Sequence, residues 1–281
     1  MNSPTRSSCP LCGDLGLRAV FRKDAWTYVR CAGCGLVSLA PPPGPAELED
    51  GYAGYLSGDP REVRAWEFMT APVVKRARDL LEAAAGGCTG RLLDVGCGYG
   101  FFLREMKTRG WSVEGIEICG TGAEHAARAG IPVFRRPLES LSLPAGSYDA
   151  VTLFYVIEHV PDPIATLEEV HRILRPGGLV LLRWPHTTPV VRLLGPLARR
   201  FDLYHTPFHL WDFSPATLTR LLERSRFRGV QTVVGGCTRP ASRFGRGVSL
   251  ASGALGELLF RASRGRVLLP GLSKTTLARK P

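Results

Sequence analysis

Apolar runs alternate with helical patterns through most of the chain after residue 60. Short buried-strand patterns occupy residues 92–95, 112–116, 131–134, 150–155, 179–183 and 230–234. Apolar residues at helical spacing occupy residues 65–85, 101–109, 121–128, 162–174 and 215–225. Strands that alternate with helices of this length predict an α/β domain with a parallel sheet covered on both faces.

The first 40 residues have a different pattern. Short β-like runs occur at residues 17–21 and 26–29, and the proline-rich residues 40–45 (APPPGP) form a stiff break. We therefore predict a small N-terminal domain at residues 1–40, a linker at 41–60 and the α/β domain at 61–281.

The composition is that of a globular protein, because 44% of the 281 residues are hydrophobic and 22% are charged. No apolar run approaches the ~18 residues of a membrane-spanning helix. The first ten residues lack the apolar core of a signal peptide. These features predict a cytoplasmic protein.

Positive charge is concentrated near the C-terminal end. The net charge is +11, and residues 239–281 hold nine lysines and arginines against one glutamate. Such a segment can meet the phosphates of nucleic acid, of lipid or of a nucleotide-linked substrate. A solvated basic surface without a partner is the alternative.

The run RLLDVGCGYG, residues 91–100, places three glycines directly after a strand that ends in Asp94. A dinucleotide-binding GxGxxG motif needs its third glycine at position 101, where the chain has Phe101, and the sequence here lacks the Gly-Lys-Ser/Thr ending of a phosphate-binding loop. Bare glycine backbone beside a carboxylate favours a positively charged ligand that lies against the chain.

This run resembles the first motif of class I S-adenosylmethionine-dependent methyltransferases. The resemblance continues over about residues 60–236, through VEGIEI, RPLESLSLP, YDAVTLFYVIEHVPDP and LRPGGLVLL. It implies a Rossmann-like fold with a mostly parallel seven-stranded sheet and helices on both faces. Glu117 matches the acidic residue that accepts both ribose hydroxyls in this family. The implied cofactor contacts are Asp94, Gly96, Gly98, Gly100, Glu117, Ile118, Leu138 and Phe154.

Four of the eight cysteines form two close pairs. CPLCG and CAGCG place Cys9, Cys12, Cys31 and Cys34 as two Cys-x2-Cys turns separated by eighteen residues. Two such turns bring four thiolates to the corners of a tetrahedron, which predicts a zinc ribbon. The zinc would be structural, because four thiolates leave no open coordination position. An iron centre or two disulfides are the lesser alternatives.

The segment YVIEHVPDP, residues 155–163, resembles the fourth motif of quinone-pathway O-methyltransferases, in which a motif of this shape ends in Glu-His. Some of those enzymes hold a divalent ion with two carboxylates and the histidine. Here Tyr155 takes the position of the first carboxylate, which leaves Glu158 and His159. We predict His159 as the general base, with a histidine that only lines the pocket as the alternative.

A second group of aromatic residues and histidines lies at residues 204–213 (YHTPFHLWDF), before the helix predicted at 215–225. The predicted acceptor contacts are Tyr155, Glu158, His205, His209 and Trp211. Aromatic residues in this position also occur as core residues, which is the alternative reading.

The last residues, LSKTTLARKP, resemble the final antiparallel strand of the methyltransferase family, so residues 237–270 become a basic insertion. Apolar residues with interspersed arginines in this insertion fit a helix that lies on a membrane surface or over the pocket. Packing against the core is the alternative.

These features predict a methyltransferase that uses S-adenosyl-L-methionine, carries structural Zn²⁺, and methylates oxygen on a small or carrier-linked molecule. One alternative is an RNA methyltransferase, although the basic segment lacks the interleaved aromatic residues of a base-stacking surface. Others are a sugar C-methyltransferase, which the zinc ribbon also resembles, and a binding module without turnover.

Overall fold

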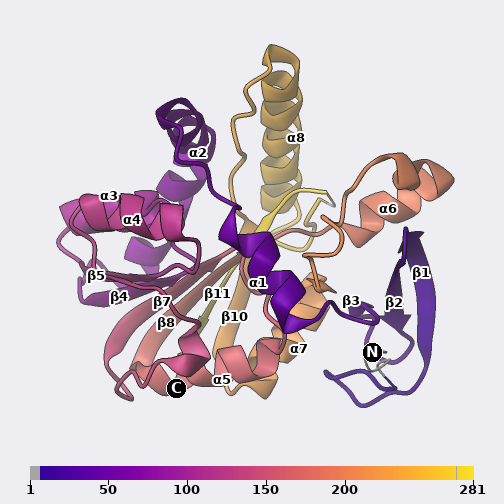
Figure 1. Ribbon diagram of the computed structural model, residues 1–281, viewed down its shortest axis with the longest axis horizontal. Coiled ribbons are helices and arrows are strands. Elements are labelled where there is room, and N and C mark those ends of the chain that lie inside the picture. The colour runs from indigo at the N-terminus through magenta and orange to yellow at the C-terminus, as the bar shows by residue number, and fades with distance from the viewer. Residues whose placement is uncertain (1–6, 270) are drawn as a thin grey trace.

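The computed structural model describes residues 7–269 and 271–281, and a seven-stranded sheet forms its centre (Figure 1). The strands are β4 (Arg91–Val95), β5 (Ser112–Ile116), β6 (Val133–Phe134), β7 (Tyr148–Phe154), β8 (Leu174–Trp184), β10 (Arg228–Val234) and β11 (Lys274–Arg279). Their order is β10-β11-β8-β7-β4-β5-β6. β4 to β8 are parallel, and β11 runs antiparallel to both of its neighbours. The predicted Rossmann-like fold with a mostly parallel sheet is confirmed.

Helices cover both faces of this sheet because its central strands are apolar on both sides. One face packs against α5 (Pro163–Ile173) and α7 (Pro215–Arg224), which contribute Leu167 and Leu218 to the core. The other face packs against α2 (Pro60–Ala84), α3 (Phe101–Thr108) and α4 (Gly120–Arg128). Parallel strands buried on both faces place the ligand site at their carboxyl ends.

The residues predicted as a linker, 41–60, contain helix α1 (Pro45–Ala53). α2 then begins at Pro60, five residues earlier than the apolar spacing predicts. Its N-cap is Asp59, whose side chain accepts a hydrogen bond from the Arg61 amide at 2.7 Å, and a proline in the first turn needs no amide partner. This start brings the turn between the two helices toward the glycine loop.

The N-terminal residues form a separate four-stranded antiparallel sheet. It consists of β1 (Leu17–Lys23), β2 (Trp26–Cys31), β3 (Val37–Leu39) and β9 (Trp211–Asp212), in that order. β9 belongs to the segment that precedes α7, so the N-terminal sheet is completed by a strand from the C-terminal half. Val37 pairs with Asp212, and Ser38 pairs with Trp211.

Two segments extend from the body in Figure 1: α6 (Thr188–Leu194), which is followed by a 3-10 turn, and α8 (Arg243–Ala262), which lies in the predicted insertion between β10 and β11. The described part of the chain contains no helix with the length and apolar character needed to cross a membrane.

Candidate active site

Asp94 is the penultimate residue of β4 and lies beneath the glycine loop. Its side chain is 1% exposed, and Oδ1 accepts a hydrogen bond from the Thr152 hydroxyl at 2.6 Å across the β4–β7 pair. Burial raises the pKa of Asp94 to about 8. The Asp94 carboxyl lies under the loop, where the strand register sets it opposite Thr152.

Glu117, which follows β5, connects the glycine loop to the turn after β5 through hydrogen bonds. One carboxylate oxygen accepts a hydrogen bond from the Gly98 amide and the other accepts one from the Cys119 amide, both at 2.8 Å. Burial raises the pKa of this carboxyl above its ordinary value. An ionised carboxylate offers about four acceptor positions, so the bonds from the Gly98 and Cys119 amides do not use all of them. The remaining positions fit the two hydroxyls of a ribose.

The three glycines of the loop have positive φ angles, and two of them show why no side chain is tolerated. A Cβ on Gly100 would lie 2.8 Å from Cβ of Ala126, so this glycine allows α4 to pack closely. Gly98 has a φ of 54°, and the nearest atom to a Cβ there is Leu56 Cδ1, 3.8 Å away. Gly98 therefore serves the loop conformation and keeps bare backbone beside Glu117.

The other predicted cofactor contacts differ in accessibility. Ile118 is 45% exposed directly after Glu117, so its side chain is available to a flat apolar ring. Leu138 is 2% exposed and belongs to the core, and the ring of Phe154 packs edge-on against Phe102 with centroids 4.8 Å apart. Of these three side chains, only that of Ile118 lies largely at the surface.

Glu158 and His159 lie in the turn after β7, at the carboxyl end of the strand. Glu158 is fully buried, and neither of its carboxylate oxygens has a hydrogen-bond partner within the described residues. Burial raises its pKa to about 8, with Asp212 adding to the rise and Arg183 opposing it. Glu158 therefore carries its proton at neutral pH.

His159 is held through one ring nitrogen. Nδ1 lies 2.9 Å from the carbonyl oxygen of Phe208 and 3.0 Å from the hydroxyl of Tyr52. A carbonyl only accepts hydrogen bonds, so Nδ1 carries the ring proton and Nε2 presents a lone pair. Burial lowers the pKa of His159 to about 4, so the ring is neutral at physiological pH.

Two further histidines stand beside His159. The ring of His209 meets it edge-on at 4.7 Å and stacks on His205 at 5.2 Å. Ligand atoms of Glu158, His159 and His209 all lie within 4.8 Å of one another. Such a group can move a proton or hold a cation. Trp211, also predicted as an acceptor contact, is 1% exposed in the core, and its indole nitrogen donates to the Val160 carbonyl at 2.7 Å.

Tyr155 faces the base of the insertion. It has a φ of 57°, and its hydroxyl donates to the Ser273 hydroxyl at 2.9 Å and accepts from Arg183 Nε at 2.8 Å. Arg183 is 2% exposed and also donates to the carbonyl oxygens of Gly235 and Gly236. Tyr155 and Arg183 thereby anchor both ends of the insertion beside the fourth-motif turn.

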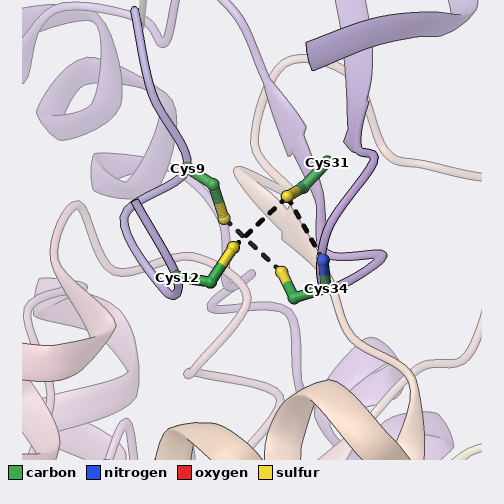
Figure 2. Close-up of side chains that lie close together, drawn as sticks. All are labelled: Cys9, Cys12, Cys31 and Cys34. Atoms are coloured by element: carbon green, nitrogen blue, oxygen red, sulfur yellow. Dashed lines mark hydrogen bonds between the residues drawn. The ribbon is translucent and has the colours of Figure 1, made fainter. Parts of the chain in front are cut away.

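The four paired cysteines converge as predicted (Figure 2). The Sγ atoms of Cys9 and Cys34 are 3.5 Å apart, as are those of Cys12 and Cys31, and all four lie within 4.8 Å of one another. Disulfide sulfurs are about 2.05 Å apart. Four thiolates about 2.3 Å from one zinc ion would be about 3.8 Å apart. The spacing fits a tetrahedral zinc site and excludes disulfides between these cysteines.

The N-terminal sheet holds the segment that carries His209. The Leu39 amide donates to the Leu210 carbonyl at 2.9 Å, and the Tyr28 hydroxyl donates to the His209 carbonyl at 2.9 Å. On the other side of the segment, the amides of Leu210 and Trp211 donate to the Glu158 carbonyl at 2.8 and 3.2 Å. Residues 208–212 therefore connect the cysteine-bearing domain to the turn that carries Glu158 and His159.

One tyrosine of the predicted linker belongs to the site, and sequence reasoning missed it. Tyr52 bonds His159, as described above. Tyr55 is 56% exposed, and its ring meets that of Trp66 edge-on with centroids 6.4 Å apart. The available signal was the run GYAGYL, because binding residues lie disproportionately on connecting segments.

Comparison with known proteins identifies relatives of this arrangement. A family model described as a methyltransferase domain matches residues 65–232. The ubiquinone biosynthesis O-methyltransferase of Pseudomonas aeruginosa is 30% identical over 140 residues, which cover 47% of this chain and 60% of that protein. The protein of the same name from Chromobacterium violaceum is 28% identical over 176 residues, covering 59% of this chain and 75% of that one.

Solved structures agree on the fold. Phosphoethanolamine N-methyltransferase 2 of Haemonchus contortus, in complex with S-adenosyl-L-methionine, superposes with a TM-score of 0.59 at 16% identity, covering 87% of this chain and 63% of that one. A methyltransferase from Archaeoglobus fulgidus that depends on the same cofactor gives 0.54 at 21% identity, covering 79% and 100%. At these identities the similarity shows the fold alone.

Proposed function

Because the chain belongs to the methyltransferase domain family, we propose that this S-adenosylmethionine-dependent methyltransferase methylates a hydroxyl oxygen of a small or carrier-linked molecule. The observation that carries the proposal is the neutral His159, which is fixed through Nδ1 at the carboxyl end of β7. The O-methyltransferase relatives support the same reaction, at about 30% identity over part of their length.

The glycine loop and the turn after β5 would hold the cofactor. S-adenosylmethionine supplies a methyl carbon that is activated by positively charged sulfur. Glu117 would accept the ribose hydroxyls, Gly98 would leave backbone for the nucleoside to lie against, and Ile118 would pack on the adenine. The buried carboxylate and the bare loop therefore fit this group.

His159 would remove the proton of the acceptor hydroxyl. Its Nε2 lone pair accepts the proton, which leaves a more nucleophilic oxygen, and the Phe208 carbonyl holds the ring orientation through Nδ1. Glu158 and His209 would line the acceptor side of the same cluster. Proximity of the oxygen to the methyl carbon then supplies much of the rate enhancement.

A labelled methyl donor tests the reaction. Purified protein is incubated with cell extract and S-adenosylmethionine carrying a labelled methyl group, and the labelled product is identified by mass spectrometry. We expect the label in a small or carrier-linked molecule, on oxygen. Label in RNA, or on carbon of a sugar, would contradict the proposal and support one of the alternatives.

We also propose that the four cysteines bind zinc with a structural role. The 3.5 Å sulfur contacts support a closed tetrahedral site. The Arg224 side chain of α7 donates to the carbonyls of Pro10 and Leu11 at 3.0 and 2.8 Å, so the first cysteine turn is attached to the methyltransferase domain. Metal content of the purified protein, measured by mass spectrometry, tests the site.

Substitution of Glu117 is expected to weaken cofactor binding. Glu117→Gln replaces two charge-assisted acceptor positions with one neutral carbonyl and an amide, so we expect the dissociation constant for S-adenosylmethionine to rise by roughly 10-fold to 100-fold. Glu114→Gln on β5, the strand that Glu117 follows, is the matched control, because that carboxylate is bonded to Tyr148 and Arg91 instead. Calorimetry measures both. Equal affinity in the Glu117 variant and the wild type would remove Glu117 from the site.

A further inference from the structure

Helix α8 exposes a continuous apolar stripe. Phe244, Val248, Leu255 and Leu258 are 83%, 52%, 49% and 63% exposed. Together with the exposed Ala251 and Ala262 they follow a spacing of four and three residues alternately, which places all six on one face of a helix. This face, more than four turns long, has no cover within the described residues.

The opposite side of α8 is the one that packs on the protein, and it consists of small residues. Gly253 and Gly256 are its buried positions. A Cβ on Gly253 would lie 1.8 Å from Cys237 Sγ, and one on Gly256 would lie 2.6 Å from Leu272 Cδ1. The glycines let the helix lie close to the segments on either side of it, so the apolar stripe faces outward because of how the helix is packed.

Positive charge borders one side of the stripe. Residues 237–273 contain six arginines and one glutamate. Arg243 and Arg261 each precede a stripe residue by one position, about 100° around the helix, so both lie on the same side of the stripe. Arg261 also pairs with Glu257 at 2.7 Å. At the base of α8, Arg239 together with Lys75 and Arg76 of α2 lines a hollow of about 410 Å³, which also includes Asp79. Apolar surface bordered by arginines is complementary to a bilayer with anionic headgroups.

We propose that α8 docks this enzyme on an anionic membrane surface, with the stripe in the acyl boundary and the arginines at the phosphates. A second copy of the chain fits the stripe less well, because packing two stripes together brings their flanking arginines toward one another in a protein of net charge +11. A nucleic acid would pair with the arginines and leave the apolar side chains in water.

Vesicle flotation tests the docking. The protein of residues 1–281 is mixed with vesicles of phosphatidylcholine, with or without about one third phosphatidylglycerol. We expect flotation with the anionic vesicles, at least ~10-fold weaker partitioning onto neutral ones, and loss of binding as salt rises. Absence of flotation, or equal partitioning onto both vesicles, would overturn the proposal.

Two variants assign the contact to α8. Val248→Glu with Leu255→Glu is expected to lower partitioning by ~10-fold or more, because it places carboxylates in the stripe. Leu15→Glu is the matched control, since Leu15 is 76% exposed on the N-terminal domain. Arg243→Gln with Arg246→Gln should remove the preference for anionic lipid. Unchanged partitioning in the stripe variant contradicts the proposal.

Sedimentation and cofactor calorimetry complete the design. A wild-type dimer that the stripe variant converts to monomer would mean that the stripe joins two copies, which overturns membrane docking. Because flotation needs neither cofactor nor acceptor, its outcome is independent of the proposed methyl transfer. Unchanged cofactor affinity in each variant shows that the fold is intact.

Discussion

If the four-cysteine site holds the proposed zinc, its removal is expected to abolish methyl transfer and leave cofactor binding nearly unchanged. Structural zinc contributes about 10–16 kcal/mol to the folding of small zinc domains, so its loss should unfold the N-terminal sheet. That sheet holds residues 208–212 through Tyr28 and Leu39, and those residues hold Glu158 and His159. Gly98 and Glu117, which we propose hold the cofactor, are fixed by β4 and β5 instead.

Cys12→Ser tests this expectation without a chelator. We expect turnover to fall by at least ~100-fold, because proton transfer and orientation are both disturbed, while cofactor affinity changes by less than about threefold. Cys88→Ser is the control, since Cys88 is an exposed cysteine outside the cluster. If cofactor affinity is lost together with turnover, the N-terminal sheet and the methyltransferase domain fold as one unit. Full activity in the metal-free protein would show that the ribbon does not position the acceptor side.

Tyr28→Phe separates positioning from folding. The substitution removes the hydroxyl that donates to the His209 carbonyl and retains the ring that stacks on Tyr204 at 4.2 Å. If the contact positions the catalytic turn, turnover should fall and cofactor affinity and metal content should stay constant. An unchanged turnover number would assign Tyr28 to stability alone.

The fold was predictable from the sequence because its signals are local. Six of the seven strands of the central sheet, and the helices that cover it, have their own apolar pattern, and the cysteine pairs are close enough in sequence to specify a metal site. The last strand was predicted from the family resemblance instead. The signal for the glycine loop is equally local, since Asp94 and the three glycines lie within one short connection between a strand and a helix. For these features, the residues that determine the structure lie within a few positions of one another.

The acceptor side was less predictable because it depends on contacts between distant residues. β9 has two residues and no strand pattern of its own, and it exists because β3 pairs with it. Tyr28 bonds the carbonyl of a residue 181 positions away. Trp211 and His209 belong to the same aromatic run, yet Trp211 is buried in the core and His209 lies beside His159. No periodicity in the sequence predicts these long-range contacts or which residues of the run are buried.

Replacement of His159 should produce the second large loss of activity. His159→Gln keeps a polar side chain of similar size and removes the basic nitrogen, so we expect turnover to fall by ~10²-fold to 10⁴-fold with cofactor affinity unchanged. His171→Gln is the matched control, because His171, on α5, packs edge-on against Phe227, away from the cluster. Single-turnover kinetics and calorimetry measure the two effects.

The pH dependence provides a second readout for the same residue. Burial lowers the pKa of His159 to about 4, so its basic form is lost only as pH falls toward 4. Wild-type turnover limited by this group should therefore rise between about pH 3 and 5 and then stay flat to neutral pH. A histidine at its ordinary pKa would instead move this rise to about pH 6.5. A variant without the base should not show this rise of turnover between about pH 3 and 5. If the rise persists in His159→Gln, another group transfers the proton.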